Sequence, residues 1–157
     1  MSTFLRSLEF LGLSIWLGSD IFLSFVVAPG AFSVLASRDA AGAVVGYALT
    51  RMHWMGVVCG AVVLLARVLR TRSAGSLTAA SSCVLLMILL TVISQLAVSP
   101  RMAALRVRMG SVQAAALDSP LLAEFSRLHR ISVSLESAVL LAGFAALFLL
   151  VRETAHP

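Results

Sequence analysis

The stretch Ala80–Val98, ASSCVLLMILLTVISQLAV, is a run of 19 residues without a charged side chain. About 20 apolar residues in a helix cross the ~30 Å hydrocarbon core of a bilayer, so this stretch predicts a transmembrane helix. Three other runs of similar character occur at Phe10–Val34, Val44–Ala66 and Ile131–Val151. The sequence therefore predicts four membrane-spanning helices.

The helical pattern extends beyond each apolar run and predicts transmembrane helices at about 8–34, 42–69, 78–109 and 120–152. Gly110 is a natural helix stop, and Ser119 followed by Pro120 is typical of a helix start. Short connections favour antiparallel neighbours. We therefore expect one all-α domain over residues 1–157, an integral membrane up-down four-helix bundle. Helices of about 30 residues are ~45 Å long and would project beyond one membrane face.

The composition excludes a water-soluble globular domain and a nucleic-acid-binding protein. The chain is 60% hydrophobic and 12% charged, whereas soluble domains carry about 25% charged residues. Its partner is thus the lipid bilayer. All twelve cations are Arg, and they lie at the ends of apolar runs, as headgroup anchors do. This Arg-only, Ala-rich composition is typical of a GC-rich bacterial genome, which predicts the bacterial cytoplasmic (inner) membrane.

Ionisable side chains within the apolar runs are informative because each costs about 2.5–3.5 kcal/mol on insertion. Asp20 lies nine residues before Pro29, near the expected bilayer centre. In the last helix, His129 and Glu136 share a face at i and i+7, and Gln95 lies on a polar face of the third helix. These positions predict which side of each helix faces the interior.

The second helix carries a glycine stripe. Gly42 and Gly46 form one GxxxG spacing, Gly56 and Gly60 form another, and His53 lies on the same face. Such stripes let helix backbones approach closely, so these glycines predict helix packing and place His53 in a seam between helices. His53 is then either a buried, hydrogen-bonded packing residue or a ligand.

Several polar groups are expected to meet at one membrane interface. In an up-down bundle the prolines that end the apolar cores of the first and third helices lie on the same side as the arginines and histidines that open the second and fourth. Pro100 also frees a backbone carbonyl that could face a cavity. The candidate ligand-binding residues are Asp20, Arg51, His53, Gln95, Arg101, His129 and Glu136.

Two interpretations of this site involve a cofactor. In one, His53 and His129 are axial ligands of haem b, because imidazole suits iron and bundle cores commonly hold cofactors. In the other, the two histidines bind a soft metal such as copper with Met52, Met55 and Cys59. The metal ligands expected in both are His53 and His129.

Two further interpretations need no cofactor. Asp20, Gln95 and Glu136 could form, with the histidines, a polar ladder that carries a proton or a small cation, since intramembrane carboxylates commonly mark such pathways. Alternatively, the same residues form a hydrogen-bonded network that fixes helix register.

Two parts of the sequence resemble a known family. The segment from Trp16-Leu17-Gly18 through Phe25-Val26-Val27-Ala28-Pro29 to Phe32, and Phe125-Ser126-Arg127-Leu128-His129-Arg130-Ile131-Ser132, look like the transmembrane-protein-205-like domain. This resemblance implies a four-helix membrane fold and brings no established activity. The first helix more distantly resembles the copper-resistance D and HemJ-type membrane proteins. Those have a histidine before the WxG element, where this sequence has Glu9.

The sequence contains no GxSxG, P-loop, HExxH or paired CxxC motif, so we expect a non-enzymatic protein. The leading prediction is a membrane protein with a polar intramembrane site that binds or moves a cation, metal or haem. The alternatives are a haem-dependent membrane oxidoreductase and a structural subunit that associates with a membrane-protein partner or a second copy.

Overall fold

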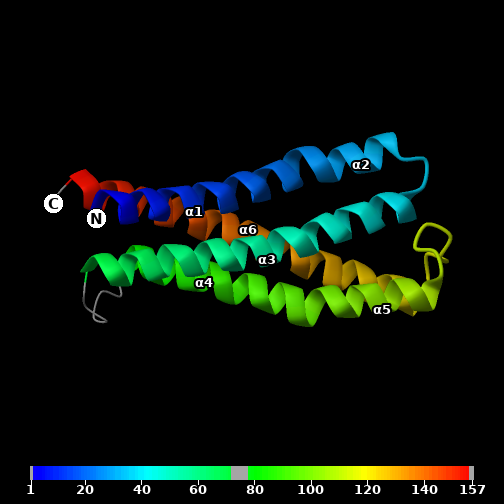
Figure 1. The fold of residues 1–157 in the computed structure, drawn as a ribbon. Coiled ribbons are helices and arrows are strands. Elements are labelled where there is room, and N and C mark those ends of the chain that lie inside the picture. The colour runs from blue at the N-terminus through cyan, green and yellow to red at the C-terminus, as the bar shows by residue number, and fades with distance from the viewer. Residues whose placement is uncertain (1, 72–77, 156–157) are drawn as a thin grey trace.

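The computed structural model describes residues 2–71 and 78–155, and its four helical rods run alternately up and down (Figure 1). The first rod consists of α1 (Ser2–Phe22), a π-helical turn η1 (Leu23–Val27) and α2 (Ala28–Val34), and the second is α3 (Arg38–Thr71). The third consists of α4 (Ala79–Ile93), a second π-helical turn η2 (Ser94–Val98) and α5 (Ser99–Met109), and the fourth is α6 (Pro120–Ala155). The predicted all-α four-helix membrane fold is confirmed.

All four rods are long and apolar enough to cross a membrane. Spans of 31 to 34 residues are ~46–51 Å long at 1.5 Å per residue, so their ends extend beyond a ~30 Å hydrocarbon core. Large apolar side chains such as Phe22, Leu89 and Phe144 are exposed on the outside of the bundle, where lipid would cover them. The second connection, between the helices predicted at about 42–69 and 78–109, includes residues 72–77, which lie outside the described residues.

Neither proline ends its rod. Pro29 is the second residue of α2 and Pro100 is the second residue of α5. A proline has no N–H for the helical hydrogen bond, and in both rods the turn before it is π-helical. The N–H of Ala28 donates to Leu23 O, and that of Ser99 donates to Ser94 O, each five residues back. The π-helical turns let both rods continue past the proline.

Apolar packing fills the half of the bundle that holds the chain termini. Trp16 from α1 is 1% exposed, and its indole lies against the second GxxxG pair of α3. A Cβ atom on Gly56 would lie 2.4 Å from Trp16 Nε1, and one on Gly60 would lie 2.6 Å from Trp16 Cζ3. Both glycines therefore serve packing within this chain, because any larger residue at these positions would place its Cβ atom in the space of the indole.

A buried ion-pair network closes the same half. Arg67 of α3 is 2% exposed; its guanidinium donates to Glu9 Oε2 of α1 at 3.2 Å and to both carboxylate oxygens of Glu153 of α6 at 3.0 and 2.8 Å. It also donates to Ser81 Oγ and Thr78 Oγ1 at the start of the third rod. Arg70 Nε donates to Glu9 Oε1 at 2.8 Å. We call these six residues the terminal ion-pair network; it joins all four rods.

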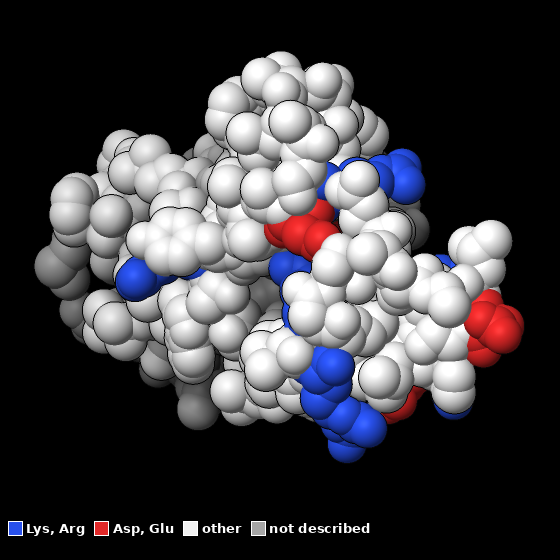
Figure 2. All heavy atoms as spheres, turned by 90° about the vertical axis from the view of Figure 1, so that its right-hand side faces the viewer, with Lys and Arg blue, Asp and Glu red and all other residues white. Residues whose placement is uncertain are grey.

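In the other half, packing is mostly within two pairs, α2 with α3 and α5 with α6. Arg106 of α5 reaches across to α3, where its Nη1 donates to Gly42 O at 2.7 Å and its guanidinium lies over the ring of Phe125. At the same end Asp39 accepts hydrogen bonds from the hydroxyl of Ser111 and the N–H of Val112. Figure 2 shows this end face, where arginine and acidic side chains lie among uncharged ones.

Candidate functional site

His53 is the centre of a buried polar cluster. Its side chain is 1% exposed and projects from α3, one turn from the glycine that accepts Trp16. Its Nδ1 lies 2.9 Å from Gln95 Oε1 of η2, and its Nε2 makes a hydrogen bond with Glu136 Oε1 of α6. His53 therefore joins three rods through two hydrogen bonds, and both ring nitrogens contact protein oxygen atoms.

The first rod contributes Asp20, which is 1% exposed. Ser24, one turn later in η1, donates its hydroxyl to Asp20 Oδ1 at 3.3 Å. Asp20 also interacts electrostatically with both Glu136 and His53. The structure thus brings together one predicted residue from each rod. We call Asp20, His53, Gln95 and Glu136 the central polar cluster.

The central polar cluster lies deep within the membrane-spanning part of the bundle. Each of its four residues is within two positions of the midpoint of its own span, as the spans Thr3–Val34, Arg38–Arg70, Ala79–Met109 and Pro120–Glu153 are bounded. The π-helical turn η1 begins three residues after Asp20, and η2 itself contains Gln95. π-Helical turns inside helices are frequent at functional sites.

The hydrogen bonding of this cluster is incomplete within the described part of the chain. Asp20 Oδ2 and Glu136 Oε2 are buried carboxylate oxygens that have no hydrogen-bond partner there. The hydroxyls of Thr91 and Ser94, on the third rod within one turn of Gln95, are also buried and have no hydrogen-bond partner there. Buried polar atoms are normally hydrogen-bonded, so two such carboxylate oxygens in one cluster call for a functional explanation.

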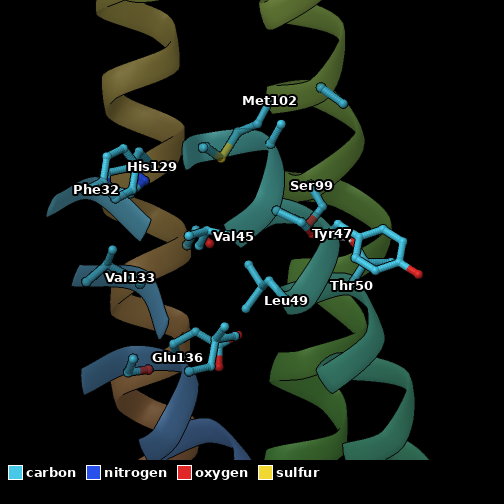
Figure 3. Close-up of a pocket in the computed structure, with 18 of the residues that line it drawn as sticks. Phe32, Val45, Tyr47, Leu49, Thr50, Ser99, Met102, His129, Val133 and Glu136 are labelled. Atoms are coloured by element: carbon cyan, nitrogen blue, oxygen red, sulfur yellow. Dashed lines mark hydrogen bonds between the residues drawn. The ribbon is translucent and has the colours of Figure 1, made fainter. Parts of the chain in front are cut away.

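A cavity of about 670 Å³ lies between the helix pairs, on the side of the central polar cluster that faces α2 and α5. Glu136 lines its deep end, and Phe32, Arg106 and His129 line its outer part. Figure 3 shows Glu136 at one end of this lining, with His129 and Met102 toward the other, and Val45 pointing into the space between them. Glu136 is therefore both a cluster residue and a cavity residue.

Three predicted site residues lie outside the central polar cluster. His129 is exposed and lies on the cavity wall, seven residues before Glu136 on α6. Arg51 is exposed and its guanidinium lies 5.2 Å from the ring centroid of Tyr47. Arg101 is exposed on α5. The two arginines lie at the surface, where side chains of this kind anchor a helix at the headgroups.

The residues predicted as haem or metal ligands lie in different surroundings, His53 buried within the central polar cluster and His129 exposed on the cavity wall. Each ring nitrogen of His53 is already in contact with an oxygen of Gln95 or Glu136. Within residues 2–71 and 78–155 no three His, Cys, Asp or Glu side chains are grouped closely enough to hold a metal ion. Cys59 is a free thiol, and Met55 is exposed on the outside of α3.

Sequence reasoning missed the role of Ser24 in holding Asp20, and it missed the terminal ion-pair network. It treated Arg67 and Arg70 only as charges at a helix end. A signal for the network was present, because Glu9 lies in the first apolar helix and Glu153 lies at the end of the last one. Carboxylates at these depths need cationic partners on neighbouring helices.

Comparison with known families agrees with this architecture. Residues 11–111 match the model of a domain of unknown function, DUF4149. Neither the comparison with curated proteins nor the comparison with solved structures gave a match. The matched residues include three of the four residues of the central polar cluster and both π-helical turns. Since the match covers most of its length, this chain belongs to the DUF4149 family of membrane domains of unknown function.

Proposed function

We propose that this protein binds a cation at the central polar cluster and exchanges it against a proton. The observation that carries the proposal is a pair of carboxylates beside His53, the buried Asp20 and the partly buried Glu136, which each keep one buried oxygen without a partner among the described residues. Carboxylates at membrane depth are costly unless their charge is neutralised. A bound cation or a bound proton would provide that neutralisation.

The charge count of the cluster supports an exchange of one species for the other. With both carboxylates ionised and His53 neutral, the site carries two negative charges, and two protons make it neutral. Gln95 contributes no charge and orients His53 through Nδ1. When one proton leaves, one negative charge remains, and a single monovalent cation balances it. The net charge in the low-dielectric interior is then the same before and after the exchange.

The surroundings of the cluster favour access from one side only. Toward α2 and α5 the cavity leads to Glu136. Toward the chain termini the bundle is filled by the apolar core around Trp16 and is closed by the terminal ion-pair network. This arrangement favours binding and release through one membrane face over a continuous pore.

The proposal is tested by infrared spectroscopy of the purified protein in lipid across a pH titration. The carbonyl band of a protonated, buried carboxylic acid should disappear as pH rises. Glu136→Gln and Asp20→Asn should each remove part of this band. Glu124→Gln is the matched control, since Glu124 is an exposed carboxylate on the same helix and its loss should leave the band of the buried acids unchanged.

A second measurement follows proton release into a weakly buffered solution when sodium, potassium or tetraphenylphosphonium salts are added. Release by at least one of these cations, lost in Glu136→Gln and retained in Glu124→Gln, is the expected result. If the wild-type protein has no titrating carboxylic acid band and releases no proton to any cation, the site is a packing network.

The finer family assignments belong to this proposal. The resemblance to the transmembrane-protein-205-like domain fits a four-helix protein with a polar intramembrane site. Membership of the copper-resistance D or HemJ-type proteins has less support, because Glu9, at the position of their histidine, is paired with Arg67 and Arg70. A haem-binding role would also require His53 to give up one hydrogen bond. We propose the bacterial inner membrane as the location, from the composition.

A further inference from the structure

The size and lining of the cavity say more about the cation than the central polar cluster does. A cavity of about 670 Å³ has the volume of a site for a small organic ligand, for which ~300–1,000 Å³ is usual. An inorganic ion needs a few oxygen ligands and leaves most of such a space unused. The dimensions of the cavity therefore point to an organic ligand.

Most of the lining is apolar. Leu23, Phe25 and Phe32 contribute from the first rod, Val45 and Leu49 from α3, and Val133 from α6. Hydroxyl groups from each rod are interspersed among them, and Glu136 is the acidic residue of the lining. Burial of apolar ligand surface against such walls is favourable by roughly 25 cal/mol per Å². A ligand with a large apolar surface would thus be retained here.

The charges of the lining are not equally available to a ligand. Arg106, in the outer part, donates to Gly42 O, lies over Phe125 and interacts electrostatically with Asp39. Glu136 has Oε1 on His53, whereas its Oε2 has no partner in the described part of the chain. The cavity therefore offers a ligand one uncompensated negative atom at its deep end.

We propose that the cavity binds a lipophilic organic monocation, with its charged centre at Glu136 and its apolar body against the walls. This inference rests on the proposed function, because it uses the same carboxylate to hold the charge. The cation replaces the proton of the acid, which leaves through the same opening, so charge balances across the step.

The test uses two probes of nearly equal size and shape and opposite charge, tetraphenylphosphonium and tetraphenylborate. Equilibrium binding of each radiolabelled probe is measured on the purified full chain in lipid nanodiscs. Tetraphenylphosphonium should bind saturably and tetraphenylborate should not. Glu136→Gln should weaken tetraphenylphosphonium binding by roughly 10- to 100-fold, the Coulomb attraction lost between unit charges about 6–12 Å apart at an effective dielectric constant of ~20. Glu124→Gln should leave it unchanged.

A second pair of variants tests the cavity itself. Val45 points into the cavity (Figure 3), whereas its neighbour Val44 is 50% exposed on the outside of α3. Val45→Phe should abolish tetraphenylphosphonium binding and preserve the infrared carboxylic acid band, whereas Val44→Phe should preserve both. Ser99→Leu, on α5 in the same lining, provides a second filling variant if Val45→Phe does not fold.

Two results would overturn the inference. Equal binding of both probes, unchanged in Glu136→Gln, would mean an apolar pocket that takes any lipophilic molecule. Absence of tetraphenylphosphonium binding, with the titrating carboxylic acid band intact, would leave the proposed function in place for a small inorganic cation and remove the organic ligand. Absence of that band in the wild-type protein, together with no proton release to any cation, would instead refute the proposed function.

Discussion

Arg67→Met tests whether the terminal ion-pair network holds the four rods together. Methionine has a similar reach and no charge, so the change removes the guanidinium and keeps most of the packing. The guanidinium donates to two carboxylates and two hydroxyls from the three other rods, at 2.6 to 3.2 Å. All of these bonds are lost in the variant.

The expected loss of stability is about 3 kcal/mol. Removing one partner of a buried ion pair costs about 3–5 kcal/mol, because the other charge is left without compensation. Two features place the value at the low end of this range. Glu9 retains its ion pair with Arg70, whose Nε lies 2.8 Å from Glu9 Oε1. The side chain of Glu153 is 34% exposed, so water can solvate its carboxylate.

The free energy of unfolding is measured by titrating the protein from mild detergent into sodium dodecyl sulfate. A loss of about 3 kcal/mol lowers the equilibrium constant for folding by more than about 100-fold. Arg108→Met is the matched control, because Arg108 is exposed on α5, and surface substitutions usually change stability by less than about 0.5 kcal/mol.

A double variant separates charge from packing. Glu9→Gln in the Arg67→Met background removes the carboxylate that lost its partner. The stability lost in the double variant should therefore be smaller than the sum of the losses in the two single variants, by about 0.5–3 kcal/mol. If Arg67→Met is no less stable than Arg108→Met, the network contributes nothing to the bundle and the reasoning is wrong.

Two other parts of the fold give matched tests. Gly56→Ala places a Cβ atom 2.4 Å from Trp16 Nε1 and should lower the free energy of unfolding by about 1–3 kcal/mol in the same titration. The control is Gly18→Ala, with no atom within 4 Å of its Cβ position, which should leave this free energy unchanged or raise it by up to ~1 kcal/mol. Asp39→Asn removes one of two acceptors for the α5–α6 connection, so trypsin should cut the end of α5 several-fold faster. Asp118→Asn, at an exposed position of the same connection, should leave the rate unchanged; equal rates in both variants would contradict the role of Asp39.

The four helices were predictable because few backbone conformations are stable in the hydrocarbon core of a bilayer. A chain segment in hydrocarbon must satisfy its own backbone, which makes a long apolar run a helix. The inward direction of Asp20, His53 and Glu136 followed from the same cost, since each would be expensive against lipid. Sequence alone could thus suggest that these side chains face one another across the bundle.

Contacts between rods were harder to predict than the direction of a side chain. The prolines illustrate the difficulty, because the predicted helices at about 8–34 and 78–109 run past Pro29 and Pro100, whereas the π-helical turn before each proline was not predicted. The insertion of one extra residue into a turn rotates everything that follows, and residue spacing along the chain does not reveal it. His129 was grouped with His53, although it is exposed and lies on the cavity wall, seven residues and thus ~10 Å along α6 from Glu136.

The two polar networks of the bundle differ in a way that bears on function. In the terminal ion-pair network two arginines face two glutamates, so the charges balance, and the network closes the bundle at the end of the spans. In the central polar cluster two carboxylates face one histidine, and two buried oxygens keep no partner among the described residues. A network that only fixed helix register would gain stability from a balanced set, because unpartnered buried charge is costly. The imbalance at Asp20 and Glu136, beside a cavity large enough for a ligand, is therefore the strongest reason to regard the cluster as a binding site.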